Sequence, residues 1–162
     1  MKQFIIFTII FAIVSNSLAK DIVVFKTKDS TPIKVAPSDD SEKYLVEMFD
    51  YYAISVKWQS EDKKRTRNVF VLRTYNFNID ISEKCPSFTI KSYDKKSSCK
   101  IRLLALQQTD EGTIWIWVPE NEDKGFNFID LKEAEYIFEN MDPPIKTSTI
   151  NTIIKTADEQ LN

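Results

Sequence analysis

The sequence contains no histidine, and this absence removes a large class of mechanisms. Histidine is the side chain that most often exchanges protons near neutral pH, and its imidazole is a common zinc ligand. The two cysteines are the only other soft metal ligands, and two are too few for a zinc site. We therefore expect neither imidazole-dependent catalysis nor a bound metal or cofactor.

Glycine is nearly as scarce, because only Gly112 and Gly125 occur in 162 residues. Glycine-rich loops that bind phosphate groups are thereby excluded. Residues 120–131 place Gly125 at the sixth position, as in a calcium-binding loop. However, Lys124 occupies a ligand position and Leu131 replaces the glutamate that would bind calcium through both oxygens, so this stretch predicts no calcium site.

No hydrophobic run reaches the about 20 residues that a helix needs to cross a bilayer, yet a shorter one opens the chain. This run covers residues 4–14, follows Lys2, and leads through small polar side chains to Ala19. Such a pattern is typical of a secretory signal peptide. We predict that residues 1–19 are cleaved after Ala19, which leaves a secreted or periplasmic chain, residues 20–162, with no integral membrane segment.

The mature chain is long enough for one globular domain with a hydrophobic core of its own. Its charge is unevenly spread, because residues 57–102 hold 12 basic and 5 acidic side chains, whereas residues 103–162 hold 4 and 12. The formal net charge of −2 for the whole chain therefore conceals a basic middle and an acidic last third. Since the predicted compartment holds no nucleic acid, we do not expect nucleic-acid binding.

Alternating and helical hydrophobic patterns predict an α+β fold, with an antiparallel sheet of about five or six strands followed by two C-terminal helices. Residues 41–52 fit either a helix or a twisted strand, and we favour the helix. We identify no internal repeat. Strands are predicted near residues 21–26, 52–58, 68–81, 88–93, 100–106 and 113–118, and the two C-terminal helices at residues 131–141 and from about residue 147 to the end.

Short polar segments predict how these elements connect. Residues 52–58 and 68–81 should pair as one hairpin, and residues 100–106 and 113–118 as another through the turn at 109–112. Asp130, with a glutamate three residues later, has the spacing of a capping box at a helix start. Two prolines follow that helix and should end it, so residues 142–162 could fold as a partly independent helical segment.

Cys85 and Cys99 are the only cysteines, and an even number in an exported chain favours a disulfide between them. A simple hairpin turning at residues 94–98 would conflict with this bond, because it would hold Cys85 roughly 26 Å away along an extended strand. A disulfide needs Cα atoms within about 7 Å. We keep the bond, and therefore expect residues 86–98 to fold back as a compact loop.

Basic side chains gather in two predicted turns, within residues 61–67 and 94–102. If both turns lie at the same end of the sheet, they would form a cationic patch suited to an anionic glycan, a phosphorylated polymer or an acidic protein. The alternative is that they only keep exposed turns hydrated. The candidate binding residues are Lys63, Lys64, Arg65, Arg67, Lys95, Lys96, Lys100 and Arg102.

Two apolar surfaces each have two interpretations. Trp115 and Trp117 share one face of a strand, which the C-terminal helices could cover or which could form an exposed platform that binds a sugar or an apolar partner. The last helix carries a stripe that includes Ile150, Ile153 and Ile154. This stripe could pack on the sheet or mediate contact with a partner or a second copy, as in a dimer.

Together these patterns favour a non-enzymatic binding or inhibitory protein that acts through a protein–protein surface. The alternative is a module that binds envelope glycan or another anionic polymer through the basic turns. A third hypothesis is a small hydrolase with Glu120 and Glu122 as paired carboxylates. A hydrated acidic turn explains that pair more simply, so we assign no catalytic residue.

Overall fold

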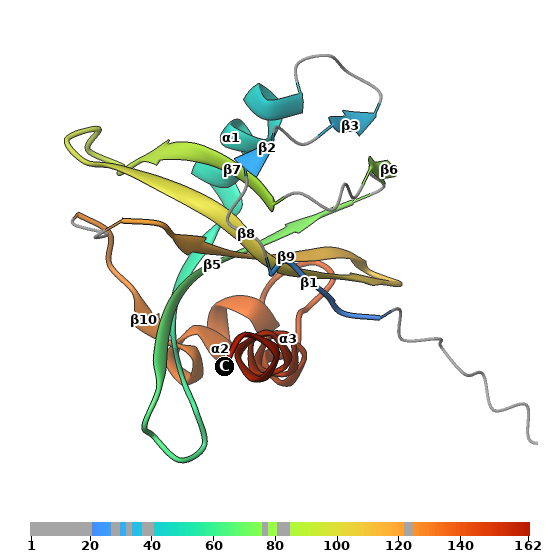
Figure 1. Cartoon of the computed structure of the whole chain (residues 1–162), viewed down its shortest axis with the longest axis vertical. Coiled ribbons are helices and arrows are strands. Elements are labelled where there is room, and N and C mark those ends of the chain that lie inside the picture. Colours follow the sequence, from blue (N-terminus) through green and yellow to red (C-terminus); the bar gives the residue numbers. More distant parts are fainter. Residues whose placement is uncertain are drawn as a thin grey trace, which may run out of the picture.

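The structure is a computed structural model that describes residues 21–26, 30–31, 34–36, 41–75, 78–80, 85–121 and 125–162. The predicted signal peptide, residues 1–19, and Glu122 of the carboxylate pair lie outside these residues. In the described part of the chain the fold is α+β, as the sequence predicted. A mostly antiparallel sheet carries helices on both faces (Figure 1).

Eight strands of the described residues form the main sheet. Its long strands are β4 (Ile54–Gln59), β5 (Thr66–Thr74), β7 (Cys85–Lys91), β8 (Ser98–Thr109) and β9 (Gly112–Pro119), and its short ones are β1 (Val23–Val24), β2 (Ser30–Thr31) and β10 (Ile129–Asp130). The order is β10–β4–β5–β9–β8–β7–β2, and β1 also pairs with β8. Two further short strands, β3 (Lys34–Ala36) and β6 (Asn78–Asp80), pair with each other.

Most predicted elements are confirmed. The three helices are α1 (Ser41–Tyr52), α2 (Leu131–Glu139) and α3 (Thr147–Leu161), so the ambiguous stretch at 41–52 is a helix. Both predicted hairpins form, and in the second one Thr109 pairs with Gly112. Strands such as β2 and β10 were not predicted, because two residues are too few to show an alternating pattern.

The start of α2 differs from the predicted capping box. Asp130 is the N-cap residue, but its side chain makes no capping hydrogen bond. Asp130 also belongs to β10, where it pairs in parallel with Lys57 of β4. The direction of the chain at this point is thus set by strand pairing rather than by a side-chain cap.

The first of two hydrophobic cores contains both tryptophans of β9. Trp115 and Trp117 are fully buried and stack with ring centroids 5.8 Å apart. Phe49 of α1 packs edge-on against Trp117. The tryptophans are therefore core residues, covered by α1 and not by the C-terminal helices as we expected, and they form no exposed aromatic platform.

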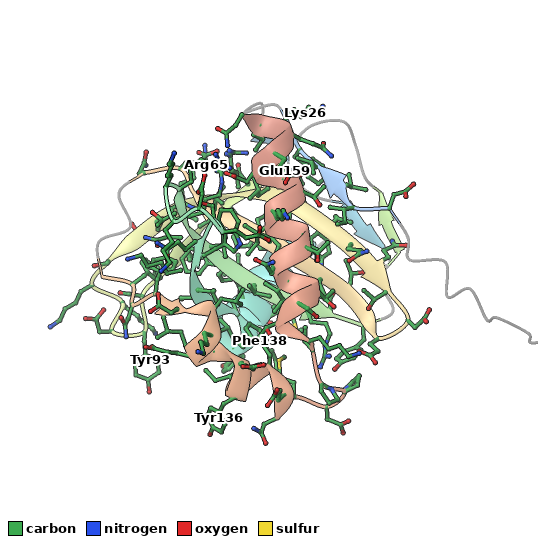
Figure 2. All side chains as sticks on the ribbon, turned by 90° about the horizontal axis from the view of Figure 1, so that it is seen from below. Lys26, Arg65, Tyr93, Tyr136, Phe138 and Glu159 are labelled. Carbon is green, nitrogen blue, oxygen red and sulfur yellow. The ribbon has the colours of Figure 1, made fainter. Side chains whose placement is uncertain are left out.

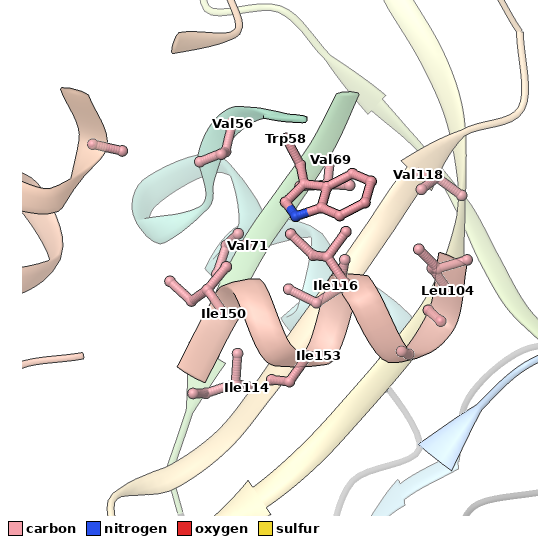
Figure 3. Packing of buried hydrophobic residues seen from close by; sticks show 14 of the residues in the cluster. Val56, Trp58, Val69, Val71, Leu104, Ile114, Ile116, Val118, Ile150 and Ile153 are labelled. Carbon is pink, nitrogen blue, oxygen red and sulfur yellow. The ribbon is translucent and has the colours of Figure 1, made fainter. Parts of the chain in front are cut away.

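The second core lies on the opposite face of the sheet, because successive residues of β9 point to opposite sides. Ile114 and Ile116 of β9 face α3, as Figure 3 shows. The isoleucine stripe of α3 lies in this core, with Ile150 and Ile153 fully buried. The stripe that could have served a dimer thus packs on the sheet of its own chain.

No disulfide joins Cys85 and Cys99, so that prediction was wrong. The chain forms the simple β7–β8 hairpin instead, and Cys99 lies opposite Ile90 in its ladder. Cys85 and Ile90 are separated by roughly 17 Å of extended strand, which is well beyond the reach of a disulfide. The Cys85 thiol donates a hydrogen bond to the Leu103 carbonyl at 2.9 Å.

Candidate functional site

The two basic turns are copies of one structure. Residues 60–65 read SEDKKR and residues 92–97 read SYDKKS. In the first turn the Ser60 hydroxyl donates to Asp62 Oδ1 at 2.5 Å, and the Lys64 backbone N–H donates to the same oxygen at 3.0 Å. The Arg65 N–H closes the turn by donating to Ser60 Oγ at 3.0 Å.

The second turn repeats each of these bonds. The Ser92 hydroxyl donates to Asp94 Oδ1 at 2.6 Å, the Lys96 N–H donates to the same oxygen at 3.1 Å, and the Ser97 N–H donates to Ser92 Oγ at 3.0 Å. In each turn the serine hydroxyl and the lysine N–H lower the pKa of the aspartate. The sequence analysis missed this repeat, although the motif S-x-D-K-K occurs in both turns.

Both turns place a lysine where the backbone is left-handed. Lys63 has a φ of 60° and Lys95 a φ of 59°. This conformation costs a residue with a Cβ about 1 kcal/mol, and glycine or asparagine normally occupies it. The turn geometry alone therefore does not explain why lysine is present at both positions.

The two turns lie at the same end of the sheet, because β5, β9 and β8 run antiparallel to one another between them. The hairpins nevertheless diverge, as Figure 1 shows: the β4–β5 tip reaches past α2 and α3, and the β7–β8 tip projects on the other side. This divergence follows from the twist of the sheet. The eight predicted basic residues therefore form two separate groups instead of one continuous patch.

The first group is tied to α3. Arg65 Nε and Arg67 Nε each lie 2.8 Å from a different oxygen of the Asp158 carboxylate. The Asp158 side chain is only 1% exposed, and Figure 2 shows Arg65 beside the C-terminal half of α3. Asn162 Nδ2 also donates to Asp158 Oδ1 at 3.0 Å. These two arginines therefore have a structural role.

The Asp158 carboxylate remains charged despite its location. Burial by itself would raise its pKa, but hydrogen bonds from Arg67 and Arg65, together with their positive charges, outweigh burial and hold the pKa below its usual value. A second ion pair joins the same elements, since Lys155 Nζ lies 3.3 Å from Glu61 Oε1. The tip of the β4–β5 hairpin is thus docked on α3 of its own chain.

The second group lies on the same face of the sheet as the second core, but beyond the residues of β8 that belong to that core. In the β7–β8 ladder Lys100 pairs with Thr89, so the two share one face, and Lys91 and Arg102 lie on the same side. The second core takes only Leu104 and Ala105 from β8. The sequence analysis missed Lys91, although it alternates with buried Ile90. We call Lys91, Lys95, Lys96, Lys100 and Arg102 the basic hairpin surface.

Few carboxylates balance the basic hairpin surface. In the described part of the chain, Lys100 Nζ lies 3.4 Å from Glu120 Oε2, and the only other carboxylate of the surface is Asp94, which accepts hydrogen bonds within its turn. Tyr93, at the tip, is fully exposed and points away from the body of the protein (Figure 2). Among the described residues, the surface thus carries five cations, two carboxylates and one exposed aromatic ring.

Gly125 holds the base of the second turn in place. Its φ is 95°, a left-handed conformation that favours glycine. A Cβ at this position would come within 2.3 Å of Ser97 Oγ, so the chain after β9 lies directly against the turn. This contact is made at Ser97, the residue whose N–H closes the turn.

A groove of about 560 Å³ lies between β4 and the first turns of α2 and α3. Lys57 and Lys132 line it together with Asp130 and Glu135, so charges of both signs are present. None of the predicted site residues lines this groove. The described residues include no group of three potential metal ligands among histidine, cysteine and carboxylate side chains.

Comparisons with known proteins do not extend this description of the site. None of the helices in the described residues is long and apolar enough to cross a membrane. The chain matches no family model, no curated protein and no solved structure.

Proposed function

We propose that this chain is a non-enzymatic binding protein of the periplasm or extracellular space that docks on a negatively charged partner through the basic hairpin surface. The observation that carries the proposal is the contrast between two copies of one turn. The first copy is docked on α3, which accounts for its arginines. The second copy projects from the sheet with the same pair of lysines and has no such structural role among the described residues.

The electrostatics of the surface support an anionic partner. Lys95 and Lys96 are exposed at the tip, and Lys91 and Lys100 are exposed on the adjoining strands. Clustered cations raise the local concentration of anionic partners and speed their association. The charge of the surface fits an acidic protein face, an anionic envelope polymer and anionic lipid headgroups alike, because all three are negatively charged.

Retention on immobilised dextran sulfate and on immobilised polyglutamate tests the proposal. We expect the exported protein to be retained and to elute as salt rises, because salt screens exposed charges. Lys95→Ala/Lys96→Ala should elute at clearly lower salt.

Lys63→Ala/Lys64→Ala is the matched control, since it removes the same charge from the same turn geometry. Its elution should change much less than that of the second-turn variant. Equal shifts for both pairs would show that net charge governs retention, and the proposal would then be wrong.

A further inference from the structure

We infer that the negatively charged partner is the surface of an anionic lipid bilayer, on which the β7–β8 tip rests with Tyr93 among the headgroups. This inference rests on the proposed function and names its partner. It starts from the side chains at the tip: Tyr93 is fully exposed, and Lys95 and Lys96 beside it are exposed as well. Tyrosine is enriched where the hydrocarbon of a bilayer meets water, and lysine is attracted to anionic headgroups.

The charge of the tip also favours this orientation. The Asp94 carboxylate accepts bonds from the Ser92 hydroxyl and the Lys96 N–H, and it is exposed at the tip. The tip therefore presents a phenol ring, two ammonium groups and one carboxylate, with a net charge of +1. The one carboxylate is outnumbered by the two lysines beside it.

The shape of the hairpin also distinguishes a bilayer from other anionic partners. A specific protein interface buries about 1,000 Å² or more, which a single protruding turn does not provide. A flat lipid surface needs no complementary cavity, so a convex tip can reach it directly. In Figure 1 the β7–β8 tip lies at the edge of the molecule, well away from the β4–β5 tip.

The two turns differ in the side chains at their tips. Glu61 occupies the position that Tyr93 has in the second turn, and its carboxylate pairs with Lys155 of α3. With Glu61 and Asp62 opposing Lys63 and Lys64, the tip of the first turn carries no net charge. The same backbone thus carries a tip suited to its own helix in one copy and a tip suited to an anionic surface in the other.

Sedimentation with lipid vesicles tests the inference on the exported protein. We expect binding to vesicles of phosphatidylcholine mixed with phosphatidylglycerol, and little binding to phosphatidylcholine alone. Each lysine near an anionic bilayer is worth about fivefold in partitioning, so Lys95→Ala/Lys96→Ala should bind about 25-fold more weakly. Lys63→Ala/Lys64→Ala should change binding much less.

A Tyr93→Trp variant provides a second measurement. Because the three native tryptophans, Trp58, Trp115 and Trp117, are buried, a change in fluorescence on binding would come chiefly from the new residue. Its emission should shift to the blue with anionic vesicles and stay unchanged with dextran sulfate, which has no hydrocarbon interior.

Two results would overturn the inference in different ways. If anionic vesicles fail to bind while dextran sulfate retention still depends on Lys95 and Lys96, the lipid partner is wrong and the proposed function stands. If vesicle binding and dextran sulfate retention are both insensitive to these two lysines, both the lipid partner and the proposed use of this surface are wrong.

Discussion

The Asp158 carboxylate is more deeply buried than the two arginines that bind it. This difference in burial predicts which substitution destabilises the protein more. The carboxylate is 1% exposed, whereas the side chains of Arg65 and Arg67 are 47% and 24% exposed. Removing both arginines by Arg65→Met/Arg67→Met leaves a buried carboxylate without a cation. Breaking a buried ion pair in this way costs about 3–5 kcal/mol of unfolding free energy.

The reverse substitution, Asp158→Asn, should cost less. The arginines can be hydrated because both are partly exposed, and the amide of the new side chain can still accept one hydrogen bond. We expect a loss of about 1–2 kcal/mol, typical of a weakened hydrogen-bond network. Urea unfolding with linear extrapolation measures both values. Equal losses, or a larger loss for Asp158→Asn, would refute the assignment of the carboxylate as the buried partner.

The pH dependence provides an independent check of the same pair. In the parent protein the folded-state pKa of Asp158 is lowered, so its stabilising contribution is present above the unfolded pKa and is lost as pH falls through the folded pKa. In the Arg65→Met/Arg67→Met variant burial acts without the cations and should raise the folded-state pKa. The stability deficit of this variant should therefore narrow as the pH falls from neutral toward about 4.

Two further predictions concern the hairpins. Lys63 and Lys95 both have a left-handed backbone, which glycine adopts without a Cβ penalty. Lys63→Gly and Lys95→Gly should therefore each raise the unfolding free energy by about 0.5–1 kcal/mol, as measured by urea unfolding. If both substitutions destabilise the protein, the lysine backbone is not strained at these positions. Reducing agent should leave the melting temperature unchanged, and Cys85 should resist alkylation in the folded protein, because burial raises the pKa of its thiol. A reductant-sensitive melting temperature would show that a disulfide forms.

The local elements of this fold could be predicted from the sequence because their signals are local. Tyr44 and the apolar residues that follow it predicted α1, and the alternation around Trp58 and Val69 predicted the β4–β5 hairpin. Each of these patterns reflects the period of one helix or one strand. The position of the first basic turn followed from this hairpin, whereas the β7–β8 hairpin that carries the second turn was rejected in favour of the disulfide.

The relations between elements could not be predicted in the same way. Alternation in β9 shows that Trp115 and Ile116 face opposite sides, but not which helix covers each side. The disulfide was inferred from compartment and cysteine count, and the β7–β8 ladder, which separates Cys85 from Cys99, overrules it. The separation of the two basic groups arises from sheet twist, which depends on the assembled sheet.

The ion pairs of Arg65 and Arg67 with Asp158 could not be predicted from the sequence for a related reason. The residues lie about 90 positions apart in the chain, and nothing in the local pattern of α3 distinguishes Asp158 from an exposed acidic residue. The repeated S-x-D-K-K motif, in contrast, was visible in the sequence. It could have indicated that the two turns share one geometry and should be compared with each other.

Lysine footprinting by mass spectrometry tests the central claim most directly, because it measures the reactivity of the lysines of both turns in one sample. A protein of residues 20–162 would be acetylated with and without dextran sulfate, and the reactivity of each lysine would be compared. The account predicts that dextran sulfate protects Lys95 and Lys96 while Lys63 and Lys64 react as before. Protection of Lys63 and Lys64 alone, or equal protection of both pairs, would contradict the claim that the second hairpin is the binding surface.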